Sequence, residues 1–472
     1  MYLILGPVFW IGFMLLEPLG GTITTRGVLG ATVWAAWYWA TGVVPLGLTV
    51  FIPLIAIGIL PNMEWSEVIQ SLLHPNIMLL LAPALLVMTW VRWGLSRRIA
   101  LHVLARMGGS VRKQTMAWLV LATVLSGLAA NVVVAIALSP IMIELLKVMG
   151  YETSQSRKES RVAMHLIISM AIGASLGGFI TPMAGGQAVI VWSVMQETLG
   201  YDIAFATWAS RIILPTFFTL LMAGFILWFT APVKDSADEQ KKYQKLLSDL
   251  PPMSRPEWLS GIIFFTGVAM MFTEPLWSGY LPSTLNLSLV FTILLVVSII
   301  IPANKGGSNK LLDEGAMKSF PIHAFMLWPV AMAFSQLITS SGAGDIVGPL
   351  LGNFWSMTPI LGIAVVVVVS GLVAQVASDT GTAGIFAPIV VASTAAVSVD
   401  PIFWLFVMGF SANLSFTVPS ATGTMAIPLC LEGKTSLYLP KYGFPIAMAC
   451  LGVSWVFWYT VEIFDLTFWF LF

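Results

Sequence analysis

Long apolar runs dominate the chain and give the first prediction of its structure. Most runs are about 20 residues long and uninterrupted, which is the length that an α-helix needs to cross a bilayer, whereas membrane strands alternate over ~10 residues. The pattern therefore predicts an all-α chain with about eleven transmembrane helices. These are residues 2–17, 27–44, 46–61, 76–95, 162–198, 208–231, 258–277, 285–302, 320–341, 402–430 and 443–465. Two further apolar stretches, 114–146 and 359–398, lie outside this set.

The composition also indicates an integral membrane protein. Of the 472 residues, 58% are hydrophobic and 9% are charged, whereas a soluble domain carries about 25% charged residues. This composition makes the lipid bilayer an expected partner. The 22 basic residues balance the 22 acidic ones, so we expect no nucleic acid as a partner. Residues 2–16 lack the basic n-region and the cleavage site of a signal peptide, and we expect a retained first helix.

The first remaining stretch, 114–146, has basic residues on both sides. Since Lys and Arg stay on the cytoplasmic side, a single crossing would place one basic cluster outside. Two crossings need ~40 residues, and 33 are available. A re-entrant hairpin that enters from the cytoplasm satisfies both limits, with its tip at 126–131. The flanking basic residues are Arg92, Arg97, Arg98, Arg106, Arg112 and Lys113 before the stretch, and Lys147, Arg157, Lys158 and Arg161 after it.

The second stretch, 359–398, repeats this pattern with the opposite orientation. Its flanks contain no Lys or Arg, and their charges are Asp345 and Asp400. We therefore expect a hairpin that enters from outside, with its tip at 375–381. Each hairpin is followed by a span with a polar middle that contains Gly and Pro, at 177–187 and at 417–424. Inverted repeats with interrupted helices in matching places are typical of secondary transporters.

These features divide the chain into a scaffold and two repeats. We expect scaffold helices at 1–75 and 258–319, a first repeat at 76–231, a cytoplasmic linker at 232–257 and a second repeat at 320–472. The first repeat contains the hairpin 114–146 and the broken helix 162–198, and the second contains the hairpin 359–398, the broken helix 402–430 and the last helix. The basic residues place the N-terminus in the cytoplasm and the C-terminus outside, in the plasma (inner) membrane.

The four breaks in the two repeats are where we expect the binding chemistry. A helix break leaves unpaired N–H groups, which attract anions, and unpaired C=O groups, which coordinate cations. Pro182 and Pro419 occupy matching positions in the broken spans, although each could be a simple kink. The alternative for Asn131 is a contact between helices, but its place at a hairpin tip favours a functional role. The short polar side chains at the breaks are Ser126, Asn131, Thr181, Ser378, Thr380, Ser420 and Thr422.

Asp379 is the residue that most strongly indicates function. Carboxylates at membrane depth are costly and usually mark ion paths or proton relays. The alternatives are an interfacial carboxylate and one that caps the following half-helix. The two cysteines, Cys430 and Cys450, and the four histidines form no metal, disulfide or triad spacing. We therefore expect no enzyme, and an intramembrane enzyme or a channel is a distant alternative.

Three segments resemble the divalent anion/sodium symporter family, the di- and tricarboxylate transporters. They are WYWATGVVPL at 37–46, GLSRRIAL at 94–101 and FTVPSAT at 416–422. The resemblance covers most of the chain. It implies a homodimer in which each protomer has a scaffold domain and a mobile transport domain that carries both hairpins. It also implies an elevator mechanism, in which the transport domain slides across the fixed scaffold.

The family's diagnostic motifs are two Ser-Asn-Thr triplets at the hairpin tips, which bind substrate carboxylates and help to hold sodium. The matching positions here are Ala130-Asn131-Val132 and Ser378-Asp379-Thr380. The family's Thr-Pro-Pro-Asn after each hairpin is altered to TPMA at 181–184 and TGTM at 422–425. Fewer donors and one added carboxylate make tight, symmetric dicarboxylate binding less secure. Asp379 could strengthen a cation site, carry a proton in place of sodium, or indicate a less anionic substrate.

We therefore expect a secondary active transporter of a small organic anion, such as a di- or tricarboxylate, coupled to sodium or protons. A sodium-independent anion exchanger is the alternative. We expect no cofactor other than Na⁺ as a coupling ion. The expected substrate-binding residues are Ala130, Asn131, Val132, Thr181, Pro182, Ser378, Asp379, Thr380, Pro419 and Thr422, and the expected ion-binding residues are Ser126, Asn131, Gly173 and Asp379.

Overall fold

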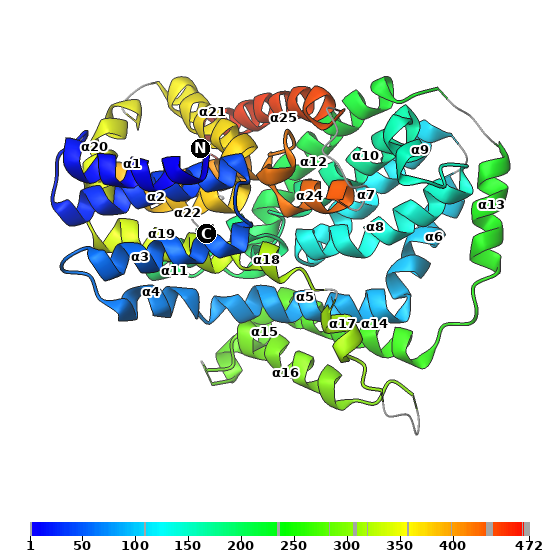
Figure 1. The fold of residues 1–472 in the computed structure, drawn as a ribbon. Helices are drawn as coiled ribbons and strands as arrows, with labels where there is room; N and C mark the ends of the chain where they lie inside the picture. The colour runs from blue at the N-terminus through cyan, green and yellow to red at the C-terminus, as the bar shows by residue number, and fades with distance from the viewer. Residues whose placement is uncertain are drawn as a thin grey trace.

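The computed structural model consists of α-helices and short 3₁₀ turns (Figure 1), with no named strand in the part of the chain that it describes. That part comprises residues 2–107, 110–233, 237–282, 284–304, 309–318, 320–355, 358–397, 399–430, 438–464 and 466. Five helices within it are long and apolar enough to cross a membrane, or six if the bent pair Arg255–Phe272 and Glu274–Tyr280 forms one span. Other apolar helices have 10–17 residues. The expected number of about eleven spans therefore stays a prediction.

The first helices of the chain pack together with a later helix. They are α1 (Tyr2–Leu16), α2 (Ile23–Thr41), the 3₁₀ turn η1 (Leu46–Val50), α3 (Phe51–Ile59) and α4 (Trp65–Leu72). Their buried side chains form one apolar cluster with residues of α19 (Leu327–Ser340), including Trp39 and Phe334. Those two rings meet edge to face, with centroids 5.9 Å apart. The N-terminal helices are therefore held to the second half of the chain by aromatic contacts.

Two series of helices follow a similar order, and some corresponding members have equal lengths. The first series is α5 (Asn76–Trp93), α6 (Leu95–Met107), α7 (Val111–Leu128), α8 (Asn131–Val148), α9 (Ser154–Glu159), α10 (Arg161–Gly177), η2 (Pro182–Ala184), α11 (Gly186–Glu197) and α12 (Phe205–Thr230). The second is α18 (Ile322–Phe325), α19, α20 (Ala343–Trp355), α21 (Pro359–Ala377), α22 (Asp379–Ala395), α23 (Pro401–Asn413), η4 (Pro419–Ala421), α24 (Gly423–Cys430) and α25 (Tyr438–Ile463). α6 and α20 have 13 residues each, and α12 and α25 have 26 each.

The helices between the two series form a separate group at the bottom of the view in Figure 1. They are α14 (Arg255–Phe272), α15 (Glu274–Trp277), η3 (Ser278–Tyr280), α16 (Leu287–Ile300) and α17 (Glu314–Lys318). α14 and α16 contact α5 and each other. Large apolar side chains on their outer faces are exposed, for example Ile262 at 55% and Ile293 at 46%. Exposed apolar faces of this extent suit lipid rather than water.

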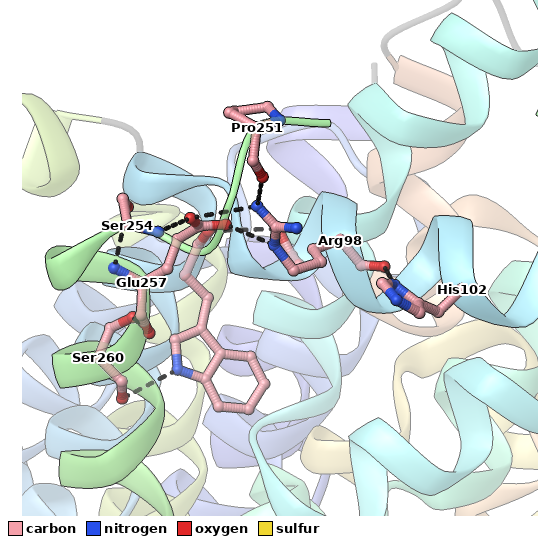
Figure 2. Close-up of polar contacts among 8 residues, drawn as sticks. Arg98, His102, Pro251, Ser254, Glu257 and Ser260 are labelled. Carbon is pink, nitrogen blue, oxygen red and sulfur yellow. Dashed lines mark hydrogen bonds and ion pairs between the residues drawn. The ribbon is translucent and has the colours of Figure 1, made fainter. Parts of the chain in front are cut away.

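The polar segment around 232–257 contains α13 (Ala237–Ser248), which lies beside α6. Arg98 of α6 anchors the end of this segment (Figure 2). Its Nη2 donates to the carbonyl of Pro251 at 2.7 Å, and its Nε donates to Glu257 Oε1 at 3.0 Å. Glu257 also accepts from the backbone N–H of Ser254, in the capping box that starts α14. An ion pair and a helix cap thus share one carboxylate, which ties α6 to the start of α14.

Candidate functional site

Both predicted hairpin tips are positions where a helix ends and a new helix begins. In the first half, α7 ends at Leu128 and α8 begins at Asn131, with Ala129 and Ala130 in extended or bent conformations. In the second half, Ser378 alone separates α21 from α22 and has φ +100°, a conformation that is strained for a residue with a side chain. The strain persists because both flanking helices are packed, and such positions are found at functional sites.

The two broken spans also share a backbone pattern. α10 ends at Gly177 and α23 ends at Asn413, and each is followed by a 3₁₀ turn with proline at its start. The residues that close the turns, Gly185 and Thr422, have nearly equal dihedrals, φ −156°, ψ 156° and φ −159°, ψ 150°. The same local geometry therefore starts α11 and α24.

The tips and the broken spans enclose one cavity of about 50 Å³. The second half-helix of each broken span packs against the hairpin of the other half, because α11 contacts α22 and α24 contacts α8. In Figure 1, α24 accordingly lies between α8 on the right and α22 on the left. α5, α18 and α19 supply the remaining wall. The lining residues are Leu80, Ala130, Asn131, Val132, Val133, Gly185, Gly186, Pro321, Phe325, Leu327, Trp328, Ser378, Asp379, Thr380, Thr422 and Gly423.

Four helices begin at this cavity. Their first residues are Asn131 of α8, Gly186 of α11, Asp379 of α22 and Gly423 of α24, and all four line it. The first turn of a helix has backbone N–H groups without intrahelical partners and carries the positive end of the helix dipole. Four such ends around one enclosed space favour a negatively charged group there.

Asp379 is buried at the second tip, with 3% of its surface exposed. Its Oδ1 accepts hydrogen bonds from the Thr380 backbone N–H at 2.6 Å, from Thr380 Oγ1 at 3.1 Å and from Ser378 Oγ at 3.4 Å. The five ion pairs found among the described residues do not include it. Asp379 therefore interacts with hydroxyl and amide donors at the start of α22.

Asn131 occupies the corresponding place at the first tip. It is also 3% exposed, and its Oδ1 accepts from the backbone N–H of the next residue, Val132, at 2.7 Å. The residues on either side of it, Ala130 and Val132, have no polar side-chain atoms. The two tips thus share a backbone cap and differ in the side chains around it.

Several of the expected site residues lie outside the cavity lining. Thr181 Oγ1 donates to the carbonyl of Gly127 at 2.9 Å and so joins the first broken span to the end of α7. Gly173 allows close contact between α10 and α7, because a Cβ there would lie 2.3 Å from the carbonyl oxygen of Leu119. Pro182 and Pro419 begin the two 3₁₀ turns. Functional roles for these residues stay predictions.

A buried amide network supports the first tip, and sequence reasoning did not find it. Gln187 Nε2 donates to Asn413 Oδ1 at 2.5 Å and to the carbonyl of Gly178 at 3.1 Å. A Cβ at Gly178 would lie 2.5 Å from Nδ2 of Asn131 and 3.0 Å from Oδ1 of Asn413. The glycine therefore lets three amide side chains gather where the two broken spans meet.

Three buried oxygens near these helix ends have no hydrogen-bond partner among the described residues. They are Ser126 Oγ, Gln187 Oε1 and Ser415 Oγ. Oxygen ligands suit a hard cation such as Na⁺, for which C-terminal carbonyls of half-helices also serve. The described residues contain no cluster of three or more His, Cys, Asp or Glu side chains that could hold a metal ion. Each of these oxygens is a neutral candidate ligand for a cation.

Sequence comparison relates the chain to known transporters. Residues 34–409 match a family model described as citrate transporter. The sodium-dependent dicarboxylate transporter SdcS of Staphylococcus saprophyticus is 24% identical over 441 residues, which cover 90% of this chain and 84% of that protein. SdcS of Staphylococcus aureus strain USA300 is 24% identical over 447 residues, covering 92% and 85%.

A solved structure has a similar fold. The crystal structure of the YdaH transporter from Alcanivorax borkumensis aligns with a TM-score of 0.55 at 13% identity and covers 92% of this chain and 98% of that one. The matched family and the aligned protein are membrane transporters and not enzymes. The fold comparison supports an all-helical fold, and the sequence comparisons support the resemblance stated above.

Proposed function

Because the chain belongs to the citrate transporter family, we propose that it is a secondary active transporter that moves a small carboxylate against its gradient by coupling to Na⁺ or protons. The observation that carries this proposal is the meeting of four helix starts at one buried cavity. A carboxylate placed there is stabilised by first-turn N–H groups and by four helix dipoles in a site of low dielectric constant.

Sodium is the first candidate for the coupling ion. The relatives are named sodium-dependent, and the buried oxygens of Ser126, Gln187 and Ser415 have no donor among the described residues. Asp379 adds a carboxylate at the second tip, and it can bind a cation or carry a proton. The two alternatives differ in one observable, because a sodium-coupled transporter responds to external Na⁺ at constant pH.

The proposed architecture has about eleven transmembrane helices and two re-entrant hairpins in inverted repeats. The matched lengths of α6 and α20 and of α12 and α25 support the repeat. The scaffold comprises 1–75 and 258–319, and the two repeats, 76–231 and 320–472, form the mobile part of an elevator. The molecule works as a homodimer in the plasma membrane, with its N-terminus in the cytoplasm.

Uptake into proteoliposomes tests the proposal. Proteoliposomes that contain the purified protein should accumulate a radiolabelled carboxylate above its external concentration when an inward Na⁺ or proton gradient is imposed. An ionophore that dissipates the imposed gradient should abolish the accumulation. A panel of mono-, di- and tricarboxylates of two to six carbons covers the class. Absence of saturable uptake for the whole panel, under sodium, proton and exchange conditions, would exclude a carboxylate transporter. Uptake that requires only counter-substrate inside the vesicles, and no ion gradient, would identify the protein as an anion exchanger and not an ion-coupled transporter.

A further inference from the structure

The lining of the cavity consists of residues that correspond in pairs between the two halves. The pairing follows from the backbone, since each member occupies the same place at a tip or at the start of a broken half-helix. Contacts across the cavity agree with it, because a Cβ at Gly186 would lie 2.8 Å from Thr380 and one at Gly423 would lie 2.8 Å from Val132. The pairs are Ala130 and Ser378, Asn131 and Asp379, Val132 and Thr380, Gly185 and Thr422, and Gly186 and Gly423.

In three of the five pairs, one member has a hydroxyl group and the other does not. Ser378, Thr380 and Thr422 have hydroxyls, whereas their partners Ala130, Val132 and Gly185 do not. The cavity is therefore polar around the second tip and apolar around the first. The apolar surface extends further through Leu80, Val133, Phe325, Leu327 and Trp328.

The donors of the polar half already serve a carboxylate of the protein itself. The Thr380 N–H, the Thr380 hydroxyl and the Ser378 hydroxyl all donate to Asp379 Oδ1. In the first half the corresponding acceptor is the neutral amide oxygen of Asn131, which binds a single backbone N–H. A ligand carboxylate placed at the second tip would have to displace Asp379 from these donors and lie beside its charge.

We infer that Asp379 takes the place of one substrate carboxylate, and that the transported molecule is a short monocarboxylate with an apolar end. This inference rests on the proposed function and adds the substrate class. The single carboxylate of the ligand lies at the first tip, at the start of α8, where Asn131 supplies no negative charge. Its hydrocarbon part contacts the apolar wall formed by residues such as Leu327 and Trp328.

Charge and size both favour this class. One ligand carboxylate together with Asp379 places two negative charges among four helix starts, whereas a dicarboxylate would place three. Like charges held close together in a buried site repel each other strongly, because the dielectric constant there is low. The cavity of about 50 Å³ has room for about four water-sized centres at ~10–15 Å³ each, which suits a short carboxylate better than a tricarboxylate.

A pair of ligands with the same number of carbons tests the inference, namely butyrate and succinate. Each is used as unlabelled competitor and as labelled substrate in proteoliposomes. The wild-type protein should take up butyrate with a kcat/KM at least about tenfold above that for succinate, because the second carboxylate meets Asp379. Asp379→Asn should reduce this ratio by about tenfold or more. The variant keeps the backbone cap, since Asn131 makes the same bond in the first half.

Asp249→Asn is the matched control, because Asp249 is exposed near the end of α13 and outside the cavity. It should leave the ratio unchanged. A wild-type preference for succinate would overturn the inference and leave the proposed carboxylate transporter intact. A folded Asp379→Asn variant that keeps the wild-type ratio of butyrate to succinate uptake would also overturn the inference and leave the proposed transporter intact. If no carboxylate of the panel is transported, the proposed function itself fails. The wild-type ratio decides the inference even if the variant does not fold.

Discussion

At the scale of single residues, glycine decides how closely polar groups approach one another. Gly178 lies where Asn131, Asn413 and Gln187 meet, and no side chain fits there without moving one of these amides. The amide of Asn131 caps the start of α8, so its position is linked to the lining of the cavity. A change at Gly178 should therefore act on binding through Asn131.

Gly178→Ala tests this link. Its methyl group would lie 2.5 Å from Nδ2 of Asn131, and overpacking of this kind typically costs about 1–3 kcal/mol. We expect lower thermal stability in detergent together with a higher KM for uptake. Gly12→Ala is the control, because nothing lies within 4 Å of a Cβ at Gly12. An unchanged KM in a folded Gly178→Ala protein would separate Asn131 from binding.

Sequence reasoning found some of the site residues and missed others for a physical reason. Asn131, Ser378, Asp379, Thr380 and Thr422 interrupt apolar runs at points where a helix must break, and all five line the cavity. Gln187 and Asn413 were missed because their partnership joins positions 226 residues apart. A buried amide within an apolar run has no local feature that separates it from an ordinary contact between helices.

At the scale of elements, buried side chains satisfy the backbone groups that the helix breaks leave unpaired. Gln375 of α21 does so for the second broken span. Its Nε2 donates to the carbonyl of Leu414 at 2.9 Å, and its Oε1 accepts from the Phe416 N–H at 2.9 Å and from Thr417 Oγ1 at 2.6 Å. One side chain therefore holds the break between α23 and α24 against the hairpin arm.

Removal of this amide should destabilise the break. Gln375→Ala leaves one buried N–H and one C=O of the broken span without that partner, at about 1–3 kcal/mol for each unsatisfied group. We expect a lower unfolding temperature and faster hydrogen exchange confined to 414–424, measured by mass spectrometry. Gln155→Ala, at an exposed glutamine of α9, should change neither. Unchanged exchange in 414–424 would show that other contacts hold the break.

The end of α5 is joined to the start of α17 by an exposed ion pair. Arg92 donates from Nε and Nη2 to Asp313 Oδ2 at 3.1 and 2.9 Å, and Asp313 Oδ1 accepts from the Ala316 N–H. Partial burial raises the pKa of Asp313, but the hydrogen bonds from Arg92 and Ala316 outweigh burial and hold it below its usual 3.8. A lowered folded-state pKa contributes stability above the unfolded pKa, and this contribution is lost as the pH falls through the folded value.

Asp313→Asn should therefore lower the unfolding temperature at pH 7. The loss is small, about 1 kcal/mol or less for an exposed pair, because asparagine caps a helix about as well as aspartate does. The difference between the wild-type and variant proteins should shrink as the pH drops through the carboxyl's folded-state pKa, because the wild-type protein then loses the same interactions. Unfolding temperatures measured across this range give the comparison. A difference that stays constant with pH would show that the charge plays no part.

At the scale of the whole molecule, the order of helices follows from the apolar runs, but their pairing across the two halves does not. The runs and their polar interruptions are local features, and each of the four predicted breaks contains the end of a helix or a 3₁₀ turn. The contacts of α11 with α22 and of α24 with α8 join segments that are about 190 and 290 residues apart, so periodicity gives no signal for them. That crossed arrangement is what encloses the cavity.

The inverted repeat predicts that the flanks of the two hairpins lie on opposite sides of the membrane. Single cysteines at Glu152, after the first hairpin, and at Val399, after the second, occupy exposed positions. With an impermeant maleimide, Glu152→Cys should react only from the cytoplasmic side and Val399→Cys only from outside. The parent chain, with Cys430 and Cys450, gives the background, and a permeant reagent confirms that both sites are reactive. Labelling of both from one side would contradict the inverted repeat.

The central claim is that a carboxylate binds between the two tips, at the cavity where four helices begin. A crystal structure with a bromine-labelled short carboxylate measures this directly, because the anomalous signal of bromine locates the ligand independently of the protein. The account predicts one bromine peak inside the cavity lined by Asn131, Gly186, Asp379 and Gly423. A peak elsewhere, for example in the apolar groove between α12 and α25, with no ligand between the tips, would contradict it.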